Sequence, residues 1–378
     1  MSELSHRWFS RIADIDSALW QTFFSDDPLT SHAFLWALEH SGCVSQATGW
    51  QPMHLAIYQD QQLVALSPGY LKSHSYGEYV FDWAWAEAYQ QHGLEYYPKW
   101  LSAVPFSPVE GHRISIKHSE PARVYQYIEQ LLQDTAKQQG WSGWHVNFCS
   151  EQVAKQLAKG SAMLRLGVQF QWFNQDHHCF NDFLHSMSAR KRKAIKKERA
   201  KISAANITIQ WYQGEQITPA QMNLFIAFYQ RTYLKRSGHL GYLNSQFFTL
   251  LQQLMADQLV LMFAKQNNQV IAATFSLKSH NTLYGRYWGA SHDIDCLHFE
   301  LCYYQGIEFC IANNLKHFHC GAQGEHKISR GFSPVYTYSA HAMIDTTFAA
   351  AIADYLQREQ QHMAIYKQQC QALLPFKQ

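Results

Sequence analysis

A repeated segment is the feature that most limits how this chain can fold. The segment 54–74 aligns without gaps on the segment 260–280, at an offset of 206 residues, and both copies end in Leu-Lys-Ser-His. In each copy an apolar stretch, a polar turn and a second apolar stretch follow one another, which predicts a β-hairpin. Two hairpins of equal length, about half a chain apart, predict a duplicated fold.

The segments around the hairpins predict a similar order of elements in both halves. In the first half we expect strands at 7–12, 144–148 and 163–173, and helices at 16–24, 31–39, 121–139 and 152–159. In the second we expect helices at 218–236, 244–256 and 297–312, and strands at 283–289, 316–320 and 336–344. This alternation predicts an α/β fold with a mixed sheet covered by helices. A polar interruption near 174–180 predicts two domains, 1–174 and 175–378.

Composition agrees with a two-domain globular protein. The chain has 378 residues, of which 47% are hydrophobic, enough to fill two cores and to exclude disorder. The N-terminal segment lacks the apolar core of a secretory signal, and no apolar run reaches the length of a membrane span. The eight Cys include no C-x-x-C pair. We therefore expect a cytoplasmic protein with reduced thiols and no membrane insertion.

Positive charge is concentrated in one short segment. Residues 190–201 hold eight basic residues and one acid, a net of +7, so the rest of the chain carries −5 of the total of +2. Arg190, Lys193, Lys196 and Lys197 recur at helical spacing and predict a cationic helix face. Such a face favours a ligand that carries phosphate. The alternative is a solvated surface helix.

A glycine-containing turn follows the predicted strand 316–320. The segment 321–330 places Glu325, His326, Lys327 and Arg330 at the start of a short predicted helix, where backbone amides bind oxyanions. Acyl transfer to an amine needs a base and oxyanion donors, and Glu325 and His326 suit these catalytic roles by type. We assign Lys327 and Arg330 to substrate binding. The alternative is a structural turn with a carboxylate at a helix N-terminus.

A second group of candidates lies on the strand 283–289 and the helix after it. Arg286 alternates with Tyr284 and Trp288, so it is either paired inside the protein or available to an anion. His298 and Glu300 begin the next helix. We predict Glu300 as a catalytic base and His298 and Arg286 as substrate-binding residues. A helix-capping role is the alternative for Glu300.

Other patterns carry no site prediction. His317, His319, Cys320 and His326 lie close in sequence but fit no standard zinc spacing, so we expect no metal site. The aromatic segments 76–85 and 96–100 are interpreted as core or interface, although they contain acids and a lysine. Motifs of serine hydrolases and P-loop proteins are absent from the sequence.

Six runs of the sequence resemble a known family. They are residues 69–86, 96–113, 188–202, 284–290, 296–311 and 321–341, and they are similar to the FemAB-like, GNAT-family peptidoglycan biosynthesis proteins. The resemblance implies two tandem GNAT-like acyltransferase domains, with catalysis in the C-terminal one. It also implies transfer of an acyl or aminoacyl group to an amine, on a phosphorylated or cell-wall-precursor-like small molecule.

Two departures from related enzymes leave the donor open. The chain has no long helical insertion of the kind that forms a coiled-coil arm in FemA-like and FemX-like enzymes, which use aminoacyl-tRNA. It also has no Q/R-x-x-G-x-G/A loop after the strand 283–289 to bind the pyrophosphate of coenzyme A. We expect no tightly bound cofactor and no DNA partner. We expect the donor to be acyl-CoA or aminoacyl-tRNA. The alternative function is a non-catalytic protein that binds RNA or another polyanion through the helix 190–201.

Overall fold

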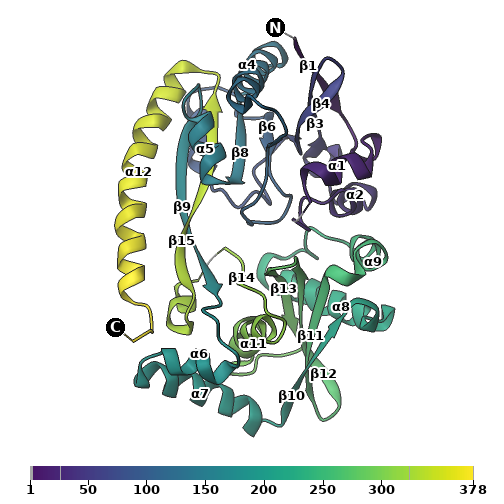
Figure 1. Ribbon diagram of the computed structural model, residues 1–378, viewed down its shortest axis with the longest axis vertical. Helices are drawn as coiled ribbons and strands as arrows, with labels where there is room; N and C mark the ends of the chain where they lie inside the picture. Colours follow the sequence, from purple (N-terminus) through teal and green to yellow (C-terminus); the bar gives the residue numbers. More distant parts are fainter. Residues whose placement is uncertain (1–2, 26, 323, 378) are drawn as a thin grey trace. The chain divides into compact units, whose positions relative to one another are not determined.

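The protein is described by a computed structural model that covers residues 3–25, 27–322 and 324–377. The chain forms two compact units (Figure 1). Unit 1 consists of Met1–Val168 and Tyr336–Tyr366, and unit 2 consists of Gln169–Val335 and Lys367–Gln378. Each unit is described by itself below.

The predicted domain limits need a correction. The chain first passes from unit 1 to unit 2 inside β9 (Met163–Phe173), close to the predicted limit at residue 174. It returns to unit 1 inside β15 (Ser333–Met343), where Ala342 pairs with Trp144 of β8. Residues 336–366 therefore belong to unit 1 and not to the second domain. An apolar strand pattern shows that a strand is buried, but it does not show which sheet the strand joins.

Unit 1 contains two sheets. Their strand orders are β1-β3-β4-β7, and β9-β15-β8-β6-β5-β2, in which β6 and β8 run parallel. The strands are β1 (Leu4–Phe9), β2 (Trp50–Pro52), β3 (His54–Gln59), β4 (Gln62–Ser67), β5 (Tyr70–Lys72), β6 (Lys99–Ser102), β7 (Ser115–Ile116) and β8 (Gly143–Cys149). The helices are α1 (Ser17–Phe23), α2 (His32–His40), α3 (Trp83–Gln91), α4 (Pro121–Gln139) and α5 (Glu151–Leu157). Buried residues of α4 spaced at helical intervals, Val124, Ile128 and Leu132, form the core with Trp100 and Trp144.

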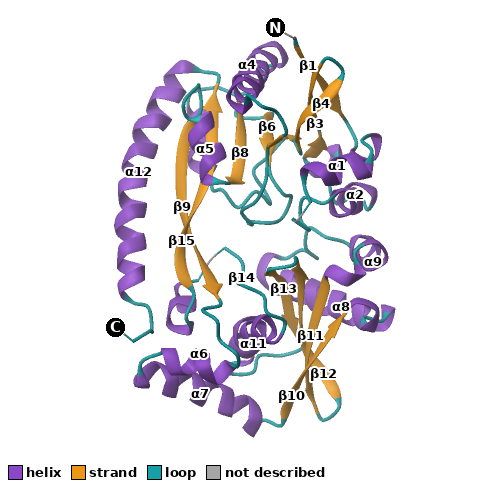
Figure 2. Cartoon of the chain, viewed as in Figure 1, coloured by secondary structure: helices purple, strands orange, loops and turns teal. Residues whose placement is uncertain are grey.

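Unit 2 has a sheet in the order β10-β11-β12-β13-β14-β9 (Figure 2). Its other strands are β10 (Ile207–Gln213), β11 (Leu259–Gln266), β12 (Gln269–Lys278), β13 (Thr282–Ala290) and β14 (His317–His319). Its helices are α6 (Phe180–Ser186), α7 (Ala189–Ala204), α8 (Pro219–Ser237), α9 (Ser245–Leu254), α10 (Leu297–Phe299) and α11 (Gln305–Ala312), and one π-helical turn, Glu300–Tyr304, joins α10 to α11. The long helix α12 (Thr346–Ala372) contains residues of both units.

Helix α8 lies directly on the unit 2 sheet. A Cβ atom at Gly289 of β13 would come within 2.1 Å of the Phe228 carbonyl oxygen of α8, so only glycine permits this approach. The predicted N-cap of α9 is confirmed, because the Asn244 side chain accepts a hydrogen bond from the Phe247 amide at 3.0 Å. No helix in the described part of the chain is long and apolar enough to cross a membrane.

Both predicted hairpins are present. β3 and β4 form the first, β11 and β12 form the second, and each contains one irregularity of register. Their turns are Asp60-Gln61 and Asn267-Asn268, all four residues having positive φ, as in the tight turns that favour hairpins. The two turns are 207 residues apart, one more than the predicted offset. The two hairpins and the α/β class with a mixed sheet are therefore confirmed, and the ungapped alignment is off by one residue at the turn. The duplication stays a prediction.

Candidate functional site

A cavity opens in unit 2 where two parallel strands stop pairing. β13 pairs with β14 only from Thr282 to Tyr284, and then continues alone on that side to Ala290. The cavity beside this unpaired part of β13 has a volume of about 130 Å³. β11, β12, the end of β14 and the segment 298–306 complete its walls. The carboxyl ends of neighbouring parallel strands are a common place for a ligand in α/β proteins.

Two residues that line this cavity carry a buried polar atom without a partner. The Thr274 hydroxyl and the Trp288 indole nitrogen both belong to lining residues, and neither forms a hydrogen bond with any of the described residues. Thr274 is only 5% exposed. Buried polar groups are nearly always hydrogen-bonded, so two such groups on one cavity indicate a place for a polar ligand.

Three ionisable side chains lie at the helix end of the cavity. His298 lines it, with its ring 4.8 Å from Trp288 and 5.3 Å from Tyr303. Burial, together with neighbouring positive groups, lowers the pKa of His298 to about 4, so its imidazole is neutral at pH 7. The Tyr303 hydroxyl and His326 Nε2 are 2.8 Å apart. Burial lowers the pKa of His326 and raises that of Tyr303, so a neutral imidazole and a protonated phenol share this hydrogen bond at pH 7.

The predicted site residues have different surroundings in the structure. Arg286 and His298 line the cavity, and His326 reaches it through Tyr303. Lys327 is buried and donates to the Gly321 carbonyl at 2.7 Å, so it holds the turn. Arg330 pairs with Glu198 at 2.8 Å and lies 3.5 Å from the Phe299 ring centre. Both cations therefore make contacts inside unit 2 and do not line the cavity. A direct role of either cation in binding stays a prediction.

The predicted cleft that joins Arg286 to Glu325 needs a correction. Glu325 is exposed and does not line the cavity that Arg286 lines. It belongs to a 3-10 turn, Glu325–Arg330, so the short helix expected there is present. Its catalytic role stays a prediction.

Glu300 also does not line the cavity that Arg286 lines. Its carboxylate accepts two hydrogen bonds from the Arg199 guanidinium, at 2.9 and 3.1 Å, and one from the Gln305 amide at 2.8 Å. Glu300 is 3% exposed and lines a different cavity of unit 2, with Lys196 and Arg199. The expectation that Glu300 and Arg286 share one cleft is therefore wrong. The carboxylate is held in an ion pair that joins α7 to the π turn.

The basic segment forms the predicted helix, α7, with two distinct faces. Ile195, Glu198, Arg199 and Ile202 face the rest of unit 2, where Glu198 and Arg199 form the ion pairs given above. Arg190, Lys193, Lys196 and Lys197 are exposed, and no described residue forms an ion pair or hydrogen bond with them. This set of four is called the basic face below. Its binding role stays a prediction.

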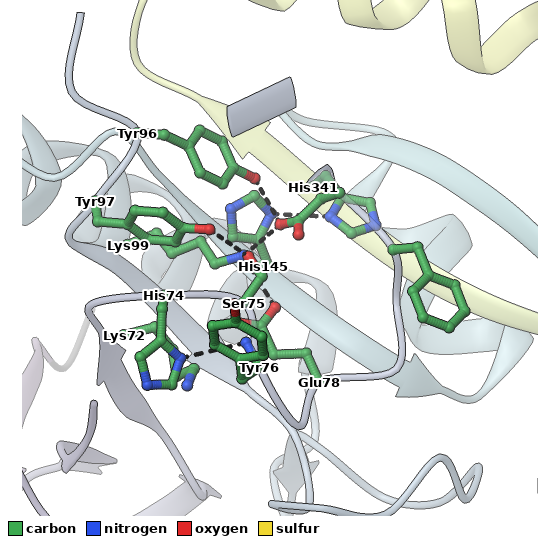
Figure 3. Close-up of polar contacts among 12 residues, drawn as sticks. Lys72, His74, Ser75, Tyr76, Glu78, Tyr96, Tyr97, Lys99, His145 and His341 are labelled. Atoms are coloured by element: carbon green, nitrogen blue, oxygen red, sulfur yellow. Dashed lines mark hydrogen bonds and ion pairs between the residues drawn. The ribbon is translucent and has the colours of Figure 1, made fainter. Parts of the chain in front are cut away.

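Sequence reasoning missed a buried charged cluster in unit 1. The Lys99 ammonium donates to Ser75 at 3.0 Å, to Glu78 at 2.9 Å and to Asp82, and all four residues are buried (Figure 3). Tyr96 also donates to Asp82, at 2.7 Å. The interpretation as core is confirmed for the segment 96–100, which encloses the Lys99 charge. In the segment 76–85 it is wrong for Tyr76, Phe81 and Trp83, which are exposed. The sequence feature that could have predicted this cluster is the occurrence of Lys99, Glu78 and Asp82 within aromatic segments.

Burial and charged neighbours shift the pKa values of residues in and near this cluster. Burial raises the pKa of Glu78 to about 7 and lowers that of Lys72 to about 7. Burial favours the neutral form of Asp82, but the Lys99 ammonium outweighs it and lowers the pKa of Asp82 to about 2. His145 and His341 are joined through their Nδ1 atoms at 2.8 Å, as Figure 3 shows. The cluster is a dense ion-pair network.

The described residues contain no group of His, Cys, Asp and Glu side chains that could hold a metal ion. Cys302 and Cys320 line the unit 2 cavity, and burial raises the pKa of both thiols. The site therefore presents neutral thiols, hydroxyls and imidazoles rather than a cluster of metal ligands.

Solved structures with a similar fold include those of three proteins. FemX matches with a TM-score of 0.55 and 9% identity, covering 92% of this chain and 100% of that one. The C-terminal domain of a putative lysylphosphatidylglycerol synthetase from Agrobacterium fabrum matches with 0.55 and 8%, covering 92% and 96%. L-PGS from Bacillus licheniformis matches with 0.51 and 11%, covering 88% and 97%. At these identities the matches show the fold alone.

Comparison of sequences identifies the family. No curated protein matches the chain. A family model, FemAB_like, described as peptidoglycan biosynthesis/recognition, matches residues 11–378. The match covers nearly the whole chain, including the cavity of unit 2 and the cluster of unit 1. The protein therefore belongs to the FemAB-like family of peptidoglycan biosynthesis and recognition.

Proposed function

We propose that this protein transfers an acyl or aminoacyl group to an amine, and that the unit 2 cavity holds the reacting carbonyl. The observation that carries the proposal is that Thr274 and Trp288, two residues that line the cavity, each carry an unpartnered buried polar atom, and that Tyr303, which also lines it, is hydrogen-bonded to His326. Acyl transfer needs donors for the oxygen that becomes negative and a group that accepts a proton. Membership of the FemAB-like family supports a transferase.

The geometry suggests a role for each group. The carbonyl oxygen of the donor accepts hydrogen bonds from the Trp288 N–H and the Thr274 O–H, which stabilise the tetrahedral intermediate. The acceptor nitrogen forms a bond to the carbonyl carbon, and the bond from that carbon to the donor's oxygen or sulfur breaks. This atom leaves with the electron pair and finally takes the proton that the amine has lost to His326. The proton from the amine passes to the Tyr303 oxygen as Tyr303 gives its own proton to His326 Nε2.

The basic face of α7 suits the charged part of a substrate. Four unpaired cations on one helix face attract phosphate groups through charge-assisted hydrogen bonds. Such groups occur on acyl-CoA, on aminoacyl-tRNA and on phosphorylated cell-wall precursors. We therefore assign Arg190, Lys193, Lys196 and Lys197 to the binding of a phosphorylated donor or acceptor.

The test is a transfer assay with one donor of each class. Acetyl-CoA and an aminoacyl-tRNA are offered to the purified protein with a lysine-containing peptide as the amine acceptor. With the active donor, we expect Tyr303→Phe and His326→Gln to lower kcat by about 10²–10⁴-fold, the usual contribution of positioned acid–base groups. The matched control, His292→Gln, changes an exposed histidine outside the cavity and should keep full activity.

Two outcomes would contradict the proposal. Unchanged kcat in both variants would remove Tyr303 and His326 from the reaction. The absence of transfer from either donor would favour the alternative, a non-catalytic protein that binds RNA or another polyanion. In that case binding through four cations should weaken with salt with a log–log slope near −3 for a single strand.

A further inference from the structure

The unit 2 cavity is small. Its volume of about 130 Å³ is slightly below the roughly 150 Å³ of an engineered protein cavity that admits benzene. On this scale the cavity holds a group of no more than about six non-hydrogen atoms. If the proposed function is correct, the acyl group that enters the cavity is therefore short.

The wall formed by Phe318 keeps the cavity small. Phe318 is 2% exposed, and its ring lies between β13 and α11. A Cβ atom at Gly306 would come within 2.3 Å of this ring, and one at Gly285 within 3.1 Å. The two glycines let the backbone approach both sides of the ring, so the ring has little room to move away from a larger ligand.

The charges around the cavity have one sign. Among the described residues that line it there is one arginine, Arg286, and no aspartate or glutamate. Glu300, which is close in sequence, is already paired with Arg199 and lines the other cavity. A buried ammonium without a carboxylate partner costs several kcal/mol in comparable sites. An acyl group with a free amino group would meet that cost here.

The environment of His298 gives independent support. Its pKa is lowered first by burial, then by the neighbouring His326 imidazole and by three cations, Arg236, Arg330 and Lys327. The same field that opposes a proton on His298 opposes an ammonium in the adjacent space. It favours a carbonyl oxygen, which accepts hydrogen bonds and becomes negative during the reaction.

We propose that the unit 2 cavity selects a short acyl group that carries no positive charge, and that it discriminates against aminoacyl groups with a free ammonium. This inference rests on the proposed function and narrows it to one class of donor. The Trp288 N–H and Thr274 O–H hold the carbonyl oxygen, Phe318 limits the length of the group, and the absence of a lining carboxylate excludes the ammonium.

Two probes of equal size test the charge selection. Isobutyramide and alaninamide differ in one group, a methyl in the first and an ammonium in the second. Binding is followed by the NMR signal of the Trp288 indole N–H, which the Trp288→Phe variant identifies. We expect isobutyramide to shift this signal, and alaninamide to bind at least roughly tenfold more weakly, a free-energy difference of about 1.4 kcal/mol. Equal or tighter binding of alaninamide, or no binding of either probe, would overturn the proposal.

Two variants separate charge from other effects. Ser276→Asp places a carboxylate on the cavity wall, so it should raise the affinity for alaninamide relative to isobutyramide. Since this buried substitution can impair folding, Thr274→Val provides a second test. It removes one donor to the carbonyl oxygen and should weaken both probes by the same factor, leaving their ratio unchanged. A changed ratio in Thr274→Val would show that the hydroxyl, and not the missing carboxylate, sets the preference.

The transfer assay distinguishes this inference from the proposed function. Isobutyryl and alanyl esters or thioesters are compared on the donor scaffold that proves active. If both groups are transferred equally well, the charge selection is wrong and the transferase function is confirmed. If isobutyramide binds as expected but no donor supports transfer, the proposed function is wrong and the selectivity of the cavity remains.

Discussion

The tetrapeptide Leu-Lys-Ser-His occurs in both units but has different surroundings in each. In unit 1, Lys72 is fully buried, donates to the Gly49 carbonyl at 3.0 Å and lies 3.6 Å from the Trp50 ring centre. In unit 2, Lys278 is partly exposed and donates to the Gln213 side chain at 2.7 Å. Burial lowers the pKa of Lys72 to about 7. The same four-residue sequence therefore does not determine how deeply its lysine is buried, because the residues packed around it do.

The wider surroundings differ in the same way. In unit 1 the polar side chains near the first repeat bond to one another, with Lys99 contacting Ser75, Glu78 and Asp82. In unit 2 the polar side chains beside the second repeat face a cavity, where Thr274 and Trp288 have no partner. Buried polar atoms without a partner also occur in unit 1, on Trp50 and Tyr70, so the contrast lies in the unit 2 cavity that Thr274 and Trp288 line. A network of bonded polar groups supports stability, whereas unpartnered groups on a cavity wall suit a ligand.

The largest effect is expected from breaking the ion-pair network of unit 1. Lys99→Met leaves Glu78 and Asp82 buried without their counter-charge, which should lower the free energy of unfolding by about 3–5 kcal/mol. The control, Lys278→Met, removes a partly exposed lysine and should change it by less than about 0.5 kcal/mol. Urea denaturation measures both. Equal midpoints for the two variants would show that the buried network adds nothing to the stability of unit 1.

A smaller effect, dependent on pH, is expected from Lys72. Its folded pKa of about 7 lies below the ordinary value of 10.5, so between these values the unfolded chain binds more protons than the folded one. Stability should therefore rise with pH in this window, by up to about 1.4 kcal/mol per pH unit. The titration of Glu78 does not mask the rise, because its window lies below about pH 7.

Variants of Lys72 and Lys278 isolate the contribution of Lys72 to this rise in stability. Between pH 7 and pH 9, Lys72→Met should lose about 2 kcal/mol of the rise that the unaltered protein shows. Lys278→Met should retain it. Chemical denaturation at the two pH values gives the comparison. A rise of the same size in Lys72→Met would mean that Lys72 is charged in the folded protein at pH 9.

The next difference in stability is expected between the loss of a hydrogen-bonded hydroxyl and the loss of a hydroxyl without a partner. Ser75 bonds to Lys99 and to Tyr97, so Ser75→Ala should cost about 1–3 kcal/mol. Thr274→Val keeps the shape of the side chain and removes a hydroxyl that has no partner, so it should be neutral or slightly stabilising. Thermal unfolding of both variants tests this. A clear loss of stability in Thr274→Val would show that the hydroxyl is bonded in the protein and is not reserved for a ligand.

Much of this fold could be predicted because apolar spacing and end signals act locally. The hairpins, α4, α8, α9 and β9 all lie within a few residues of their predicted limits. The return of residues 336–366 to unit 1 could not be predicted, because strand pairing depends on residues far away in the sequence. The one-residue error in the repeat has a similar origin, since only the turns at Asp60 and Asn267 fix the true offset.

The site was less predictable because its geometry depends on one irregular turn. With ordinary helical spacing, Glu300 shares a face with Tyr304. In the π turn the Glu300 carboxylate instead bonds to Gln305, five residues on, and the rings of His298 and Tyr303 lie 5.3 Å apart. The sequence therefore singled out Arg286, His298 and His326, which lie at or near this cavity, but not Tyr303, and the roles of all four stay predictions. Burial of Lys72 and Lys99 also follows from distant neighbours.

A small effect on stability is expected at the basic face of α7. Its cations are exposed and have no partner among the described residues, unlike the buried lysines of unit 1. Lys193→Glu introduces an opposite charge four residues before Lys197, worth about 0.3–0.5 kcal/mol in favour of the helix. The same substitution should weaken binding of a single-stranded polyanion and make its log–log salt slope shallower by about 0.7 or more, because at least one phosphate contact is lost. The control, Lys159→Glu, changes an exposed lysine of unit 1 by the same charge and should leave the slope unaltered. Equal slopes for the two variants, measured by fluorescence anisotropy across a range of salt, would mean that the exposed cations of α7 are an ordinary solvated surface. A shallower slope for Lys193→Glu alone would show that the basic face contacts phosphate groups.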